Sequence, residues 1–246
     1  ISYEASEKYM DYLNYHTDES NRFTSSHDGP WVEEYRKFEE THTNPDRLVA
    51  SLFKDKYFIL KKVNPKELMW GMYWVASDMQ NAETKVSFYD LFKGQELFDL
   101  WQCVNYRFYV GNANHADGKG IVVANAKSLL RNILDSADEA IRKGGIAATL
   151  RFGHDGNVIP LVALMQIENC NVAVSDPYEV YKVWSDFKVV PMAANVQIIF
   201  FRNEKSNDIL VKIMHNENEV HIPVQTDMFP YYRWRDVENY YRGMLK

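Results

Sequence analysis

The chain has 246 residues, of which 46% are hydrophobic and 25% are charged, and its net charge at pH 7 is −6. This is the usage of an ordinary globular protein, long enough for one large domain or for a core with a helical subdomain. The negative charge argues against a broad nucleic-acid surface, which needs clustered Lys and Arg side chains. No apolar run approaches the ~20 residues that cross a bilayer.

Residues 1–120 have a mainly helical pattern, and we expect them to form a helical cap region. Residues 31–40 follow a proline and place two glutamates in the first turn, which favours a helix start. Residues 65–80 begin with a proline at a position that helices tolerate, and they are apolar nearly all round. Such a helix is expected to be buried between neighbours. Residues 94–111 predict a third helix.

A glycine-rich loop at residues 111–120 carries Lys119. It fails the requirements of a phosphate-binding P-loop, because no Ser or Thr follows the lysine and a helix precedes it in place of a strand. We interpret it as a loop between two helices.

Residues 121–246 are expected to form an α/β core portion. A helix with one broad apolar stripe is predicted over residues 121–140, and Gly144 and Gly145 end it. The predicted strands are residues 146–152, 195–202, 208–215 and 219–224, and a closing helix covers 231–241. Two of these strands are nearly continuous apolar runs, as in the centre of a sheet. Such strands need neighbours on both sides, so we expect another polypeptide to cover an exposed edge.

The most informative stretch follows the predicted strand at residues 146–152. The chain breaks at Gly153, continues with His154 and Asp155, and enters a helix that we expect to begin near Val158. Ligands of open α/β sheets lie at the carboxyl ends of the strands, and the N-terminus of a helix favours an anion. A His and an Asp in this position can supply positive charge and a proton. The alternative is that both residues are solvated or cap the helix.

Arg151 interrupts the same apolar run two residues before the glycine. A buried guanidinium must reach solvent, a carboxylate or an anion. Two interpretations stand side by side: a contact with phosphate or substrate, and an ion pair with an acidic residue of a flanking helix.

The segment around Gly153, His154, Asp155 and Asn157 resembles the proton-donor segment of the histidine acid phosphatases. This is branch 2 of the histidine phosphatase superfamily, which includes phytases and multiple inositol polyphosphate phosphatases. The C-terminal strand pair and the closing helix also resemble that family. The resemblance implies an α/β fold in which the chain contributes part of a doubly wound sheet with a helical cap subdomain.

The family's nucleophile lies in an Arg-His-Gly-x-Arg motif, and no such string occurs in these 246 residues. The resemblance therefore implies a chain that supplies the acid and needs the N-terminal half of the same protein, and that is inactive alone. It implies His154 and Asp155 as catalytic residues, with Arg151 and Lys119 as candidate substrate contacts.

The implied reaction is hydrolysis of a small phosphate ester, of the sugar or inositol phosphate class, through a phosphohistidine. Neither a cofactor nor a metal is expected, and by resemblance the protein is exported to the periplasm or secreted. The alternative function is a non-catalytic module that binds a glycan or a peptide through its aromatic-rich helices. Cys103 and Cys170 form no C-x-x-C pair, and whether they form a disulfide stays open.

Overall fold

The computed structural model describes residues 12–13, 15–145, 147–203 and 208–246. Packing divides the chain into a helical unit, residues 30–107, and an α/β unit of residues 1–29 and 108–246. The dividing point lies within helix α7 (Gly94–Asn112). The division into 1–120 and 121–246 that the sequence suggests stays a prediction.

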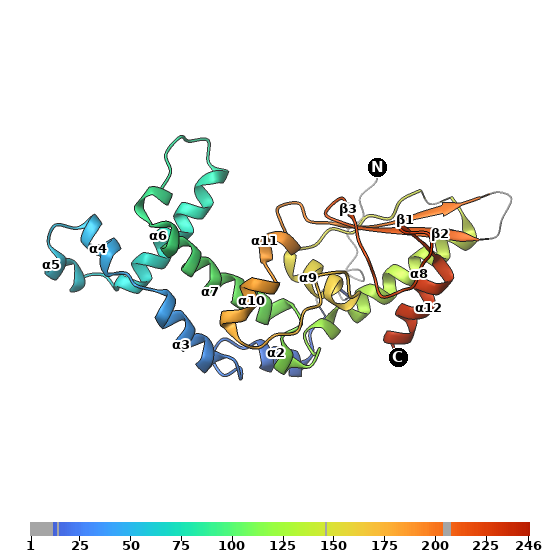
Figure 1. The fold of residues 1–246 in the computed structure, drawn as a ribbon, viewed down its shortest axis with the longest axis horizontal. Helices are drawn as coiled ribbons and strands as arrows, with labels where there is room; N and C mark the ends of the chain where they lie inside the picture. Colours follow the sequence, from blue (N-terminus) through green and yellow to red (C-terminus); the bar gives the residue numbers. More distant parts are fainter. Residues whose placement is uncertain (1–11, 14, 146, 204–207) are drawn as a thin grey trace. The chain divides into compact units, whose positions relative to one another are not determined.

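The helical unit consists of short helices around one apolar cluster (Figure 1). Its helices are α3 (Val32–His42), α4 (Asp46–Leu52), α5 (Lys56–Leu60), α6 (Pro65–Asp78) and the start of α7, with 3₁₀ turns η1 (Met79–Asn81) and η2 (Tyr89–Leu91). Asn64 caps α6, because its Oδ1 accepts a hydrogen bond from the backbone N–H of Lys66 at 3.0 Å. Met69 and Tyr73 of α6 are buried against Leu100 of α7. The three helices predicted in this region are confirmed, but the expectation that the second is buried all round is wrong, because Trp74 and Val75 of α6 are 51% and 45% exposed.

The α/β unit carries the sheet and the remaining helices. Its helices are α2 (Asp18–Thr24), α8 (Lys127–Lys143), α9 (Asp155–Leu164), α10 (Pro177–Val183), α11 (Asp186–Val189) and α12 (Trp234–Met244), with 3₁₀ turns η3 (Ala116–Gly118) and η4 (Val123–Ala126). Its strands are β1 (Val196–Arg202), β2 (Ile209–His215), β3 (Asn218–Glu219) and β4 (Tyr231–Arg233). The strands predicted at 195–202 and 208–215 are confirmed. The two predicted helices exist but start later: α8 begins at Lys127 after the 3₁₀ turn η4, and α12 begins at Trp234 because residues 231–233 form β4.

Strand β2 is the centre of the sheet. It pairs antiparallel with β1 along its whole length, from Ile209 opposite Arg202 to His215 opposite Val196. Its other edge pairs with β4 at its start and with β3 at its end. The second edge of β1 has no partner among the described strands.

Helix α12 ties the sheet to α8. The ring of Trp234 meets Phe200 of β1 edge-on at 4.9 Å, and its indole N–H donates to a carboxylate oxygen of Asp138 at 3.1 Å. Further along α12, the guanidinium of Arg242 donates to a carboxylate oxygen of Asp135 at 2.9 Å. Aromatic packing and ion pairs therefore hold one layer of helices to the sheet.

The prediction of a strand at residues 146–152 is wrong for the described residues 147–152. They form a coil that runs back along α8 to the start of α9 (Figure 1), and no backbone hydrogen bond joins residues 147–153 to any described residue. The side chains of Leu150 and Phe152 are 72% and 78% exposed. A strand requires a neighbouring ladder, and the described part of the chain offers none here.

Two smaller predictions also need correction. Helix α9 begins at Asp155, three residues earlier than expected, because the turn after Gly153 leads directly into it. Strand β3 (Asn218–Glu219) shares only Glu219 with the predicted strand at 219–224. The chain leaves the sheet because the carbonyl of His221 accepts instead from the backbone N–H of Glu168 at 3.1 Å.

The buried hydroxyl of Tyr109 holds the segment after α9. It accepts a hydrogen bond from the backbone N–H of Val174 at 2.9 Å and lies 2.6 Å from the carbonyl of Val172. Tyr109→Phe leaves the N–H of Val174 without its partner, so we expect a loss of about 1–3 kcal/mol in the free energy of unfolding. Urea unfolding followed by circular dichroism measures it. Tyr15→Phe is the control, since the Tyr15 side chain is 50% exposed and its loss is expected to stay within about 0.5 kcal/mol.

Candidate functional site at the N-terminus of helix α9

His154 and Asp155 stand at the N-terminus of a buried helix. Every residue of α9 from Ile159 to Leu164 is buried, whereas the side chains of His154 and Asp155 are exposed. A carboxylate oxygen of Asp155 accepts a hydrogen bond from the N–H of Gly156 at 2.8 Å. The two side chains therefore share the positive end of a fixed helix, where an anion is stabilised. Neither side chain lines the small pocket beside this end of the helix.

Asn157 fastens the turn that carries these residues. Its side-chain oxygen accepts from the backbone N–H of His154 at 2.9 Å, and its amide nitrogen donates to the carbonyl of Leu13 at 2.7 Å. A Cβ atom at Gly153 would lie 2.8 Å from the same side-chain oxygen of Asn157. Glycine fits this position because a larger residue would have to displace the Asn157 side chain from these hydrogen bonds.

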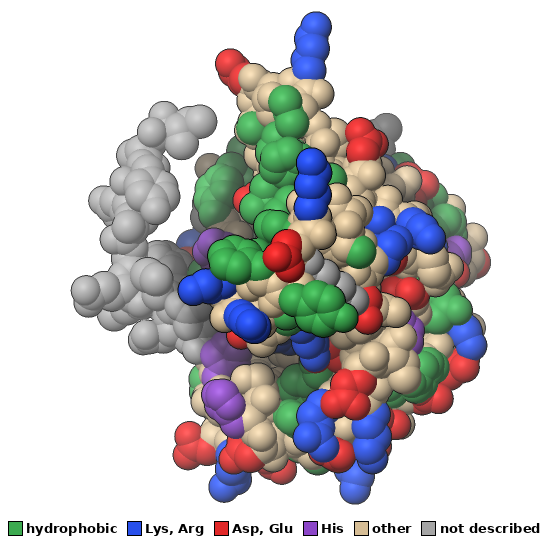
Figure 2. All heavy atoms as spheres, turned by 90° about the vertical axis from the view of Figure 1, so that its left-hand side faces the viewer, with side chains coloured by type: hydrophobic (Ala, Val, Ile, Leu, Met, Phe, Trp, Pro, Cys, Tyr) green, Lys and Arg blue, Asp and Glu red, His purple; other side chains and the backbone are tan. Residues whose placement is uncertain are grey.

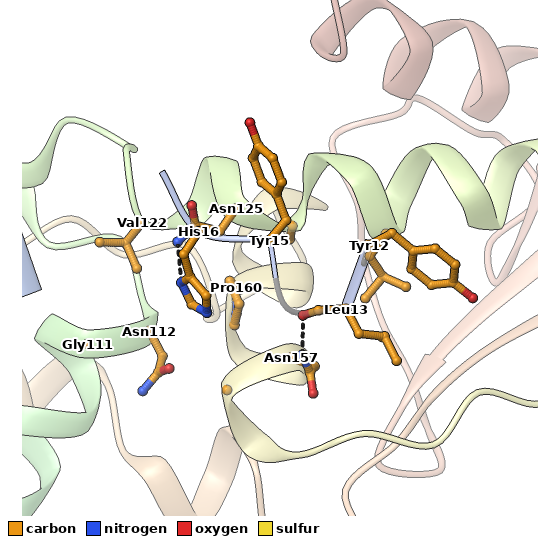
Figure 3. A pocket seen from close by; sticks show the side chains of 13 residues that line it. Tyr12, Leu13, Tyr15, His16, Gly111, Asn112, Val122, Asn125, Asn157 and Pro160 are labelled. Atoms are coloured by element: carbon orange, nitrogen blue, oxygen red, sulfur yellow. Dashed lines mark hydrogen bonds between the residues drawn. The ribbon is translucent and has the colours of Figure 1, made fainter. Parts of the chain in front are cut away.

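Tyr12, Leu13, Tyr15 and His16 lie across the start of α9 and make a small pocket with it (Figure 3). The hydroxyl of Ser128 donates to the carbonyl of Tyr12 at 3.0 Å, and the amide nitrogen of Asn125 lies 3.2 Å from Nδ1 of His16. The cavity measures about 20 Å³, which is room for about one water molecule. It is therefore a packing junction and too small for a phosphate ester.

Arg151 is bound to α8. Its guanidinium donates to the side-chain oxygen of Asn132 at 2.6 Å and to the hydroxyl of Ser136 at 2.8 Å. A flanking helix does receive the guanidinium, as one of the two interpretations expected, but through uncharged groups in place of a carboxylate. The arginine anchors residues 147–153 to α8, and its contact with phosphate stays a prediction.

Lys119 is exposed at the end of η3 and has a left-handed backbone, with φ of 48°. The preceding turn is fixed by His115, whose Nδ1 accepts from the backbone N–H of Asp117 at 3.3 Å. Burial lowers the pKa of His115, which keeps that nitrogen an acceptor. The structure does not place Lys119 among the residues that line the pocket beside α9, and its contact with substrate stays a prediction.

Sequence reasoning missed how the site is held. Asn157 was matched to the family motif without a structural role, although an amide three residues after a helix cap often reaches back to that cap. Nothing in the sequence indicated that Leu13 lies against this turn, because its contact with Asn157 spans 144 positions.

Both cysteines are free and buried, which answers the open question of a disulfide. Burial raises the pKa of Cys103 and of Cys170 to about 12, so both stay thiols. The sulfur of Cys170 lies 3.8 Å from Nδ1 of His215, whose Nε2 lies 2.8 Å from the carbonyl of Val189. This buried pair is a packing contact, because a neutral thiol is a weak nucleophile.

The described residues contain neither a metal-binding cluster nor a membrane-spanning helix. Among them, no three His, Cys, Asp or Glu side chains come together as ligands for a metal ion. None of the described helices is both long enough and apolar enough to span a bilayer.

The sequence pattern of the histidine phosphatase superfamily (branch 2) matches residues 2–216, and the chain belongs to this family. The resemblance noted from the His-Asp segment is therefore confirmed. No curated protein sequence matches the chain significantly.

Solved structures with the same fold include multiple inositol polyphosphate phosphatase from Bifidobacterium longum. Its apo form matches with a TM-score of 0.69 and 18% identity over 97% of this chain and 59% of that one. Its complex with inositol hexasulfate matches with a TM-score of 0.62 and 22% identity over 72% of this chain and 39% of that one. The chain thus spans between two fifths and three fifths of these structures. The mixed α/β, histidine-phosphatase-like fold expected from the sequence is confirmed.

The contact between Gly153 and Asn157 predicts a non-additive pair of substitutions. Gly153→Ala alone should cost about 1–3 kcal/mol of unfolding free energy, because the new methyl group meets the Asn157 side chain. In an Asn157→Ala background that cost should fall by about 1 kcal/mol or more, since the obstructing oxygen is gone.

Urea unfolding of the four proteins measures this coupling. Gly243→Ala is the matched control, because nothing lies within 4 Å of a Cβ atom there and the change in a helix should be neutral or stabilising. An equal cost of Gly153→Ala in both backgrounds would show that the close contact does not require the glycine.

Proposed function

We propose that this chain supplies the phosphate-binding histidine and the proton donor of a phosphomonoester hydrolase. The observation that carries the proposal is the placement of His154 and Asp155. Both side chains are exposed at the N-terminus of a buried helix, at the end of a segment that lacks a strand partner, in a member of the histidine phosphatase superfamily. A helix N-terminus favours the phosphate, and the two side chains supply the groups that its hydrolysis needs.

The reaction proceeds in two displacements. A histidine nitrogen from an Arg-His-Gly segment attacks phosphorus, so that a P–N bond forms while the P–O bond to the leaving group breaks. His154 donates a hydrogen bond to a non-bridging oxygen and stabilises charge on the transferring group. Asp155 protonates the departing alkoxide, then removes a proton from the water that cleaves the P–N bond. Arg151 and Lys119 are candidate contacts for the substrate.

The nucleophilic histidine is carried by a second segment of polypeptide, and that segment pairs with residues 147–153. The backbone groups of these residues have no described partners, and Leu150 and Phe152 are largely exposed. An extended apolar neighbour would bury both side chains and satisfy those groups. Because His154 directly follows this segment, a strand added here ends beside the candidate catalytic pair.

The substrate class we propose is a soluble sugar phosphate or inositol phosphate, which an exported enzyme hydrolyses. The family and the fold of the inositol polyphosphate phosphatase from Bifidobacterium longum support this class. When the P–O bond of such an ester breaks, the sugar or inositol departs as a basic alkoxide. A leaving group of this kind requires a proton from an acid such as Asp155.

The first functional prediction concerns completeness. The 246-residue chain alone should show no phosphatase turnover, because it contains no Arg-His-Gly-x-Arg nucleophile. Mixing it with a polypeptide from the same source that carries this motif should produce activity on a sugar phosphate. Hydrogen exchange should slow at residues 147–153 in the same mixture. Turnover by the purified single chain would overturn this division of roles.

The second functional prediction separates the two side chains in the completed enzyme. Asp155→Asn should slow hydrolysis of a sugar phosphate by roughly 10²–10⁴-fold and hydrolysis of p-nitrophenyl phosphate far less, because nitrophenolate leaves without a proton. His154→Ala is the matched comparison and should slow both substrates, since it removes stabilisation of the phosphoryl group. Parallel kcat measurements test this, and equal losses on both substrates in Asp155→Asn would remove that residue from the general-acid role.

A further inference from the structure

Helix α5 of the helical unit presents its apolar side chains to solvent. Tyr57, Phe58 and Leu60 are 83%, 60% and 41% exposed. No side chain described in this five-residue helix is buried. Scattered exposed apolar residues are normal in folded proteins, but three within one short helix are a concentration that favours an interaction site.

Lysines surround these side chains. Lys54, Lys61 and Lys62 flank α5 and are exposed, and none of the three forms an ion pair with a described residue. The one acidic residue of this stretch, Asp55, caps the helix by accepting from the N–H of Phe58 at 2.8 Å. Figure 2 views the face that carries α4 and α5, where hydrophobic and lysine or arginine side chains lie side by side. The local positive charge contrasts with a chain whose net charge is −6.

We propose that α5 and its flanking lysines bind the surface of an anionic phospholipid bilayer. Exposed Tyr and Phe side chains partition into the headgroup region, and lysines beside them attract anionic lipids. A bilayer fits this feature better than a protein partner, because a five-residue helix with no groove offers little area for a shape-complementary interface. The inference is independent of the phosphatase chemistry at His154 and Asp155.

Sedimentation of the 246-residue chain with vesicles tests the proposal. The chain should bind vesicles of mixed phosphatidylcholine and phosphatidylglycerol, bind pure phosphatidylcholine vesicles much more weakly, and detach as salt rises. The triple variant Lys54→Gln, Lys61→Gln, Lys62→Gln should lose roughly 100-fold in the binding constant, by the usual contribution of a lysine near an anionic surface. The pair Tyr57→Ser, Phe58→Ser should lose roughly tenfold or more.

Matched control substitutions separate the patch from overall charge. Lys37→Gln, Lys85→Gln, Lys93→Gln removes the same charge from exposed lysines elsewhere in the helical unit, and binding should change less than fivefold. Circular dichroism confirms that each variant is folded. Equal binding by the patch and control variants overturns the proposal. An absence of binding to the anionic vesicles also overturns it. If soluble inositol hexakisphosphate then protects the same three lysines from acetylation, the patch binds a soluble anion and not a bilayer.

Discussion

The burial of helix α9 is the constraint on which the candidate site depends. Its residues 159–164 are enclosed on all sides, so the helix has little freedom to turn or slide. Its first turn emerges at the surface, and the positions of His154 and Asp155 follow from that geometry. The exposed pair thus stands on a rigid element, as reacting groups require if their positions are to be held.

The polar contacts around α9 extend this rigidity to the turn before it. Asn157 joins that turn to the carbonyl of Leu13, and Arg151 joins the preceding segment to α8. Both side chains satisfy backbone or side-chain groups that would otherwise lie at a crowded junction without partners. The site is therefore held from two directions, by residues distant in sequence; the sequence left the partner of Arg151 open between an anion and a flanking helix and gave no sign of the Asn157 contact.

Residues 147–153 show that an apolar sequence pattern alone cannot identify the strand with which a segment pairs. The apolar composition is that of a central strand, yet a strand exists only where a neighbour supplies the ladder. Within the described chain the segment keeps its apolar residues exposed and bonds only through Arg151. In β2, by contrast, which has ladder partners on both edges, buried and half-exposed side chains alternate, as in a strand with one covered face.

The sequence by itself determined the helices near residues 31–40, 65–80 and 94–111, the hairpin of β1 and β2, and the family, because amphipathic spacing and the His-Asp segment are local signals. It also placed the candidate pair beside a helix N-terminus, with an error of three residues in where that helix starts. Only the tertiary structure decided that Arg151 binds α8, that Leu13 and His16 lie against the start of α9, and that residues 147–153 have no strand partner in the described part of the chain. Each of these outcomes depends on contacts between segments that are far apart in the sequence, and local sequence patterns do not specify such contacts.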